Sequence, residues 1–275
     1  MTKKILIGLA FSPNLKANLY EAIRTANVFD ASLYAVHVGI KDATKADNLK
    51  ALLANGPKLK TPLQTIWKEG NPVTVILETC VKINANLLML GALQKENIYK
   101  YYVGSIARKL TRKAPCSVLL LIKPSVERVP CNHIVVNGLE DKKTAETMAY
   151  AFYTASNFGC KRVTIVEEIS QSELEVKVND NETLREANIK KERIEKRENL
   201  RVENILKDIN TKDIIVKKQS IFGRRGYSIG HYAKVKRADL LVMNAPTKTS
   251  ALDRLFPHDL EYILSELPTD VLIVK

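Results

Sequence analysis

The sequence contains a continuous apolar run, Ala85-Asn86-Leu87-Leu88-Met89-Leu90-Gly91, and a close copy of it, Ala238-Asp239-Leu240-Leu241-Val242-Met243-Asn244. A run that is apolar on both faces is typical of a parallel β-strand covered by helices on both sides. Each is followed by a second apolar run that begins shortly after a proline: Cys116-Ser117-Val118-Leu119-Leu120-Leu121 and Asp270-Val271-Leu272-Ile273-Val274. These paired stretches indicate a tandem duplication of one module.

The first half of the chain alternates short apolar runs with stretches of helical periodicity. We predict strands at 4–9, 32–38, 63–68, 86–91 and 116–122, and helices at 14–29, 46–54, 103–112 and from Asn71-Pro72 onward. Strands that alternate with helices form right-handed βαβ crossovers, so the strands are parallel. The predicted fold class is α/β, with one doubly wound parallel sheet in each copy.

The second half follows the same order. We predict strands at 133–137, 162–166, 213–218, 239–244 and 270–274, and helices at 145–158, 227–235 and 258–267. We expect two domains, 1–125 and 132–275, joined by a linker that contains Pro124 and Pro130.

An insertion at about 173–209 separates the second and third strands of the second copy. Residues 183–208 are helical in composition, with oppositely charged pairs at i,i+4 spacing. Apolar residues gather toward the end of the insertion, at Val202, Ile205, Leu206 and Ile209. We therefore expect only that end to pack firmly. The rest is either a solvated helix or an arm for a protein partner or a second copy of the chain.

Charge is divided unevenly along the 275 residues, whose net charge is +13. Up to Ser125 there are 18 Lys and Arg against 7 Asp and Glu, and the remainder has 25 against 23. A basic half attracts phosphates and polyanions. The sequence shows no zinc finger, RNA-recognition signature or helix-turn-helix pattern, so we expect no nucleic-acid partner.

The sequence argues against membrane, secreted, disulfide-linked, metal-binding and catalytic classes of protein. No apolar run approaches the roughly 18 residues of a membrane helix, and no signal-peptide pattern opens the chain, so we expect a cytoplasmic protein. The 4 cysteines and 4 histidines are scattered, which predicts neither a disulfide framework nor a metal site of the protein's own. No catalytic triad, paired-carboxylate or P-loop pattern is visible, so we expect no efficient catalysis.

Several segments resemble a known family. The strand that ends at Gly91, the segment Val103-Gly104-Ser105-Ile106-Ala107-Arg108-Lys109-Leu110 and the run from Ala114-Pro115 are similar to the C-terminal half of a universal stress protein domain. The opening, residues 3–13, resembles that family's first strand and loop. The resemblance covers both copies and implies a tandem universal stress protein with strand order 3-2-1-4-5 in each copy. It also implies an intramolecular pseudo-dimer through the fifth strands, and leaves a homodimer of chains open.

Members of this family that bind ATP carry Gly-x-x-Gly, nine residues, and then Gly-Ser or Gly-Thr. The first copy reads Gly91-Ala92-Leu93-Gln94, nine residues and then Gly104-Ser105, so Gln94 replaces the second glycine. Glycine lets backbone approach a ligand, and the N–H groups at a helix start bind phosphate. The resemblance implies ATP or AMP, with Mg²⁺ accompanying ATP, bound by Leu9, Val38, Leu90, Gly91, Gln94, Gly104, Ser105 and Ile106.

The first copy departs from the family in a second place. Ala10 stands where ATP-binding members carry an Asp in the first loop. Basic residues surround the motif and offer partial compensation at the phosphates: Lys95, Lys100, Arg108, Lys109 and Arg112.

The second copy departs further. Its frame reads Asn244-Ala245-Pro246-Thr247, nine residues and then Pro257-His258, with all three glycines replaced. We expect that this copy has lost nucleotide binding. The segment 222–227, with Arg224 and Arg225 between two glycines, is either an anion-binding loop or an ordinary polar loop.

The leading hypothesis is a non-catalytic stress-response protein with weak ATP or AMP binding in the first domain. Slow ATP hydrolysis is left open, without a candidate base. The alternative is a nucleotide-free interaction or scaffold module that acts through its basic face and charged helix on an unknown protein partner. A third possibility is an adenine-hydrolysing or pyrophosphatase enzyme of the wider fold group. It would need a Ser-Gly-Gly-type loop where the sequence has Ala10-Phe11-Ser12-Pro13.

Overall fold

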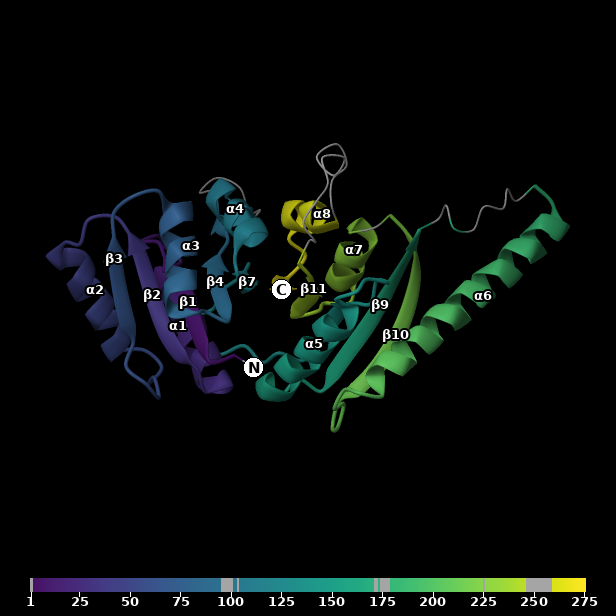
Figure 1. Ribbon diagram of the computed structural model, residues 1–275, viewed down its shortest axis with the longest axis horizontal. Helices are drawn as coiled ribbons and strands as arrows, with labels where there is room; N and C mark the ends of the chain where they lie inside the picture. The colour runs from purple at the N-terminus through teal and green to yellow at the C-terminus, as the bar shows by residue number, and fades with distance from the viewer. Residues whose placement is uncertain are drawn as a thin grey trace. The chain divides into compact units, whose positions relative to one another are not determined.

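Strands and helices alternate along the chain in the computed structural model (Figure 1). It describes residues 2–94, 101, 102, 104–170, 173, 179–224, 226–245 and 259–275. The chain divides into two units, one formed by Met1–Pro130 with Asp270–Lys275 and the other by Cys131–Thr269. The expected second domain, 132–275, differs from the second unit at its C-terminal end, since the last strand groups with the first unit.

The first unit contains β1 (Lys4–Leu9), α1 (Leu15–Phe29), β2 (Ser32–Val38), α2 (Ala43–Ala54), β3 (Gln64–Lys68), α3 (Pro72–Ile83), β4 (Leu87–Gly91), β5 (Leu93–Gln94), β6 (Tyr101–Tyr102), α4 (Ser105–Lys113), β7 (Ser117–Leu121) and β12 (Asp270–Val274). Its sheet has the order β3-β2-β1-β4-β7-β12. The first five of these strands are parallel and reproduce the predicted order 3-2-1-4-5. The last strand, β12, pairs antiparallel with β7.

The apolar runs fill the core because the central strands are buried on both faces. Ile5, Leu6 and Ile7 of β1 are completely inaccessible, as are Leu88 and Met89 of β4. Right-handed crossovers place α1 and α2 on one face and α3 and α4 on the other, because the direction of strand addition reverses between β3 and β4. The carboxyl ends of β1 and β4 therefore meet at the switch point of the sheet.

Local signals set the helix ends. Asn71 caps α3 by accepting hydrogen bonds from the backbone N–H groups of Val73 (3.0 Å) and Thr74 (3.3 Å), and Pro72 takes the first helical position. Asn84 ends the helix in the left-handed conformation, with φ of 51°. The predicted start of this helix at Asn71-Pro72 is confirmed.

The second unit contains β8 (Ile134–Asn137), α5 (Thr144–Phe158), β9 (Arg162–Ser170), α6 (Asn181–Leu206), β10 (Ile215–Gly223), α7 (Tyr227–Val235), β11 (Leu240–Asn244) and α8 (Asp259–Glu266). Its strands have the order β10-β9-β8-β11, which matches positions 3, 2, 1 and 4 of the module. The strands β9 and β10 pair in parallel over nine residues, from Ile215↔Arg162 to Gly223↔Ser170. Both strands extend further than predicted.

The insertion forms the 26-residue helix α6, which begins with a capping box at Asp180. Figure 1 shows its C-terminal part running beside β10 and its N-terminal end extending past the strand. The residues buried on α6 are Ile194, Glu198 and Val202, which form one stripe at spacing four. The expectation that only the end of the insertion packs was wrong, because packing begins at Ile194, more than two turns before the expected cluster.

Candidate functional site

The eight predicted nucleotide-site residues lie at or just beyond the carboxyl edge of the first unit's sheet. They are Leu9, Val38, Leu90 and Gly91 at the ends of β1, β2 and β4, Gln94 in β5, and Gly104, Ser105 and Ile106 at the start of α4. Because α4 connects the parallel strands β4 and β7, its N-terminus faces this same edge. Leu9 and Leu90 are buried, so only their backbone reaches the edge.

The first turn of α4 has no side-chain cap among the described residues. Gly104 is the N-cap residue, with φ of −61° and ψ of 160°, and no side chain bonds to the helix from this position. Its carbonyl accepts the first helical hydrogen bond, from the Arg108 N–H at 3.0 Å. The N–H groups of Ser105 and Ile106 precede that bond and have no partner within the helix. This helix start, with Ser105 exposed beside it, has the chemistry of an anion site.

Gly91 allows a side chain from α1 to lie directly against the edge. A Cβ atom at position 91 would come within 2.4 Å of Nδ2 and 2.6 Å of Oδ1 of Asn18. The Oδ1 atom of Asn18 is itself buried and has no hydrogen-bond partner among the described residues. An unpartnered buried acceptor carries an energetic cost that a ligand or water donor removes. Sequence reasoning missed Asn18, which lies within α1 and outside the motif.

Gln94 does not occupy a position that requires glycine. It lies in β5, which pairs antiparallel with β6 through Gln94↔Tyr101 and Leu93↔Tyr102. Extended backbone suits any residue, so the replacement of the second glycine causes no strain there. The sequence did not predict this short two-stranded sheet. Lys95 and Lys100 lie outside the described residues.

The basic residues of α4, Arg108, Lys109, Arg112 and Lys113, all follow its first three residues. Arg112 lies in the last turn, where a cation interacts favourably with the helix dipole. It is seven residues from Ser105, or about 10 Å along the helix axis. The prediction that Arg112 surrounds the motif was wrong, because a helix of this length places it at the opposite end.

Three aromatic rings gather at the carboxyl ends of β1, β2 and β3. The ring centroids of Phe11 and His37 are 4.8 Å apart, those of His37 and Trp67 5.1 Å, and those of Phe11 and Trp67 6.0 Å. His37 Nδ1 donates to the carbonyl of Leu9 at 3.0 Å, which fixes the ring orientation. All three rings are half-buried. The sequence already placed these three residues at strand ends, but the predicted site did not include them.

The corresponding edge of the second unit is occupied by side chains. Asn244, which stands in the place of Gly91, donates from Nδ2 to the Asp141 carboxylate at 3.2 Å. Asn137 Oδ1 accepts the N–H of Leu139 at 3.0 Å and closes the first loop into a tight turn. Residues 246–258, which contain Pro246, Thr247, Pro257 and His258, lie outside the described part of the chain.

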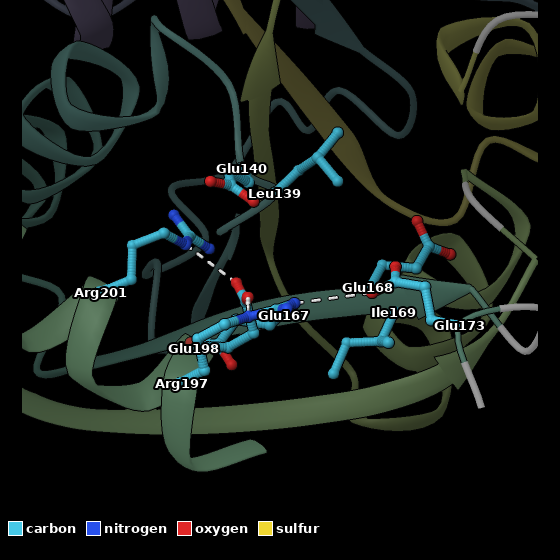
Figure 2. Close-up of a pocket in the computed structure, with 9 residues that line it drawn as sticks. All are labelled: Leu139, Glu140, Glu167, Glu168, Ile169, Glu173, Arg197, Glu198 and Arg201. Atoms are coloured by element: carbon cyan, nitrogen blue, oxygen red, sulfur yellow. Dashed lines mark hydrogen bonds and ion pairs between the residues drawn. The ribbon is translucent and has the colours of Figure 1, made fainter. Parts of the chain in front are cut away.

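The helix α6 contributes a buried ion network next to this edge (Figure 2). The Glu198 carboxylate accepts hydrogen bonds from Arg197 Nε at 2.8 Å and Arg201 Nε at 2.9 Å. Arg201 also donates to the carbonyl oxygen of Gly138, at the end of β8. Burial alone would raise the pKa of Glu198, but the hydrogen bonds from the two arginines outweigh it and lower that pKa.

Two neighbouring glutamates of β9 point to opposite faces of the sheet. Glu167 is 2% exposed, and its Oε2 accepts a hydrogen bond from Ser220 Oγ at 2.9 Å, while Oε1 has no partner among the described residues. Burial raises the pKa of Glu167. The small cavity that this residue lines with Arg197, Glu198 and Arg201 measures about 40 Å³. That is room for one or two water molecules, against roughly 300 Å³ or more for a small-molecule site.

Glu168 fills the N-terminus of α7. Its carboxylate accepts the N–H of Gly226 at 2.6 Å and the N–H of Ile229 at 3.0 Å. An internal carboxylate therefore takes the place that we considered for an external anion at residues 222–227. Arg224 bonds to the Tyr262 hydroxyl, and Arg225 lies outside the described residues. The anion-binding interpretation of this loop was wrong, because Glu168 already satisfies the helix start.

Residues 1–121 match the sequence model of the Universal stress protein family. The first domain of the chain is therefore a universal stress protein domain. A curated universal stress protein of Methanocaldococcus jannaschii is 27% identical over 144 residues, which cover 46% of this chain and 85% of that protein.

Solved structures extend the likeness in fold to the full length of this chain. A universal stress protein of Archaeoglobus fulgidus superposes with a TM-score of 0.67 at 14% identity, covering 100% of this chain and 99% of the other. A protein of unknown function from Pseudomonas aeruginosa gives 0.72 at 18% identity, covering 100% and 92%. These likenesses show the shared fold. None of the described helices is long and apolar enough to cross a membrane.

Proposed function

We propose that the first unit binds an adenine nucleotide weakly, as ATP or AMP, at the carboxyl edge of its sheet. The observation that carries the proposal is the uncapped start of α4 at Gly104 and Ser105. The phosphates bind there, where backbone N–H groups, the Ser105 hydroxyl and the positive end of the helix dipole converge. Asn18 Oδ1, buried without a partner beside Gly91, accepts a hydrogen bond from a ribose hydroxyl.

The half-buried aromatic rings supply the surface for the base. Phe11 follows the end of β1, His37 precedes Val38 at the end of β2, and Trp67 lies near the end of β3. Stacking of a base on an aromatic ring contributes about 1–3 kcal/mol. Ala10 offers no carboxylate in the first loop to bind the Mg²⁺ that accompanies ATP.

The proposed role is non-catalytic. In the described chain, His37 donates to a backbone carbonyl, His133 bonds to the buried Thr164 hydroxyl at 2.9 Å, and His231 stacks on Tyr227. None of these imidazoles contacts an accessible nucleophile, so no base is poised to activate water at the nucleotide. The second unit binds no nucleotide, because Asn244, Arg201 and Glu168 occupy the corresponding edge with internal contacts.

The test is calorimetric titration of the full chain with ATP and AMP, comparing the wild type with Ser105→Glu. A carboxylate in the first turn of a helix is favourable by about 0.3–1 kcal/mol, so this variant keeps α4 folded while it repels phosphate. We expect millimolar-range binding in the wild type and at least a tenfold loss in the variant, about 1.4 kcal/mol.

The matched control is Ala43→Glu, which adds the same charge to the first turn of α2 in the same unit. Asp42 already caps that helix by accepting the Lys45 N–H at 2.8 Å. Nucleotide affinity that stays unchanged in Ala43→Glu and falls in Ser105→Glu supports the site. An equal fall in both variants, or no binding to the wild type, contradicts it.

A second candidate function rests on α6. The N-terminal part of this helix carries the exposed apolar side chains Leu184 (46% exposed) and Ile189 (42%) among charged residues. Such a helix fits an interaction or scaffold module that acts on a protein partner without nucleotide. Failure of the titration, together with unchanged unfolding in the presence of nucleotide, favours this alternative.

A further inference from the structure

The four cysteines, scattered in the sequence, are brought together in two pairs. No disulfide joins them. The thiols of Cys131 and Cys160 interact with each other in the second unit, and those of Cys80 and Cys116 interact in the first. All four residues belong to the described chain, so the pairing uses every thiol of the protein.

Strand pairing brings Cys131 and Cys160 to the same end of β8 and β9. The parallel strands β8 and β9 pair through Ile134↔Val163 and Val135↔Thr164, a constant offset of 29 residues. Cys131 and Cys160 each precede the first paired residues, Ile134 and Val163, by three positions, so both lie just before the start of these neighbouring strands. Adjacent strands lie about 4.8 Å apart, within the roughly 4.4–6.8 Å between the Cα atoms of a disulfide.

The two pairs differ in their access to solvent. Cys131 is half-buried and reachable from solvent, whereas Cys80 is 1% and Cys116 8% exposed. The interaction with Cys131 lowers the pKa of the Cys160 thiol to about 7, against the opposing effect of burial. The interaction with Cys116, together with burial, raises the pKa of Cys80 far above its ordinary value. The interaction with Cys80 in turn lowers the pKa of Cys116, so each pair holds one thiol of lowered pKa. Since the thiolate is the reactive form and must meet the oxidant, only the second unit presents such a pair within reach of solvent.

We infer that Cys131 and Cys160 form a peroxide-sensitive thiol pair that closes into a disulfide and ties the first residue of the second unit to the start of β9. One thiolate attacks hydrogen peroxide, so that an S–O bond forms, the O–O bond breaks and the leaving hydroxide takes up a proton to give water. The other thiolate then attacks the sulfenic sulfur. The S–S bond forms as the S–O bond breaks, and the second hydroxide leaves as water. Two thiols are oxidised to one disulfide, and one peroxide is reduced to two waters.

The test treats the full chain with hydrogen peroxide, alkylates it under denaturing conditions and maps the digest by mass spectrometry without reductant. We expect a peptide that links Cys131 to Cys160 and a loss of half of the alkylatable thiols, with Cys80 and Cys116 still alkylated. The variant Cys131→Ser loses the linked peptide, and dimedone then labels Cys160. Far-UV circular dichroism checks that this variant, changed at a half-buried position, is folded.

The other pair supplies the matched control. Cys80→Ser leaves the linked peptide of the second unit and its rate of formation unchanged. The inference is overturned if the Cys80–Cys116 pair oxidises first, if the wild type accumulates sulfenic acid without a linked peptide, if Cys131 links mainly between chains, or if peroxide leaves both Cys131 and Cys160 reduced. Nucleotide titration has no part in this experiment, so its outcome is independent of the proposed function.

Discussion

Glu167 and Glu198 give opposite predictions for the same substitution. They lie in one cluster, but Glu198 accepts hydrogen bonds from two arginines while one oxygen of Glu167 has no partner among the described residues. Glu198→Gln replaces an acceptor oxygen by an NH₂ group that faces an arginine. Glu167→Gln removes a buried charge, keeps an oxygen for Ser220 Oγ and adds a donor. We therefore expect the first variant to destabilise the second unit and the second variant to stabilise it.

The expected changes in unfolding free energy follow from how exposed the paired side chains are. The Arg197 side chain is 60% exposed, so its ion pair with Glu198 contributes about 0–1 kcal/mol. The Arg201 side chain is 20% and that of Glu198 7% exposed, so a charged hydrogen bond of about 1.5–3 kcal/mol is lost there. Glu198→Gln then lowers the free energy of unfolding by about 3 kcal/mol in all. Relief of the unpartnered oxygen in Glu167→Gln gains about 1 kcal/mol.

Urea unfolding at pH 7, followed by far-UV circular dichroism, measures both changes. For an m-value of about 2 kcal/mol/M, the midpoint moves down by about 1.5 M in Glu198→Gln and up by about 0.5 M in Glu167→Gln. Trp67 is the single tryptophan of the chain and belongs to the first unit. Its fluorescence transition is the internal control and stays unchanged in both variants.

Acidification separates electrostatic causes from packing. The folded-state pKa of Glu198 is lowered, so its contribution is present above the ordinary glutamate pKa of about 4.3 and is lost as the pH falls through the folded value. The pKa of Glu167 is raised, so its cost is absent below about 4.3 and grows as the pH rises toward the folded value. The difference in unfolding free energy between each variant and the wild type therefore becomes smaller as the pH falls. The reasoning is refuted if the urea midpoints of the two variants move in the same direction, or if their differences from the wild type do not depend on pH.

Three further substitutions test the contacts of the fold. Gly91→Ala is expected to cost about 1–3 kcal/mol in urea unfolding, because its Cβ meets the Asn18 amide at 2.4 Å, and the added change Asn18→Ala restores most of that loss. Asn71→Ala removes the cap of α3 and lowers the unfolding free energy by about 1 kcal/mol, whereas Asn14→Ala, at a helix start without a side-chain cap bond, changes it little. His133 has a pKa lowered chiefly by burial, so the thermal midpoint falls as the pH drops below about 6.5, and this dependence is weaker in His133→Gln.

Hydrophobic pattern predicted most of the fold because parallel strands are buried on both faces and therefore appear as uninterrupted apolar runs. The 26 residues of α6 were predicted as a helix within two residues at each end. The packing of α6 was not predicted, because its buried stripe includes Glu198, and a charged residue is ordinarily expected to face solvent. The spacing of Ile194, Glu198 and Val202 was visible. The compensating arginines and the Gly138 carbonyl become apparent only when α6 is placed against the strand ends.

The candidate site was predictable at its strand ends and helix start, where sequence order and sheet topology alone fix positions. The register of parallel strands brings Leu9 and His37 side by side, and the crossover after Gly91 brings the start of α4 to the same edge. Asn18 could not be found in this way, because its contact with Gly91 depends on how α1 packs across the sheet. The cysteine pair was missed because 29 residues separate Cys131 from Cys160 in sequence, a distance that strand pairing removes.

The two units show how one sheet edge acquires different chemistry without a change of topology. In the first, Gly91 carries no side chain, and no side chain of the described residues caps the Gly104–Ser105 helix start, so its N–H donors lack an internal partner there. In the second, Asn244 binds Asp141, and Glu168 takes the N–H groups at the start of α7. A buried charge needs internal partners wherever no ligand supplies them. The carboxylates of Asp141 and Glu168 therefore stabilise the second unit by internal contacts at its sheet edge. The second unit's counterpart of the α4 start precedes α8 and lies outside the described residues.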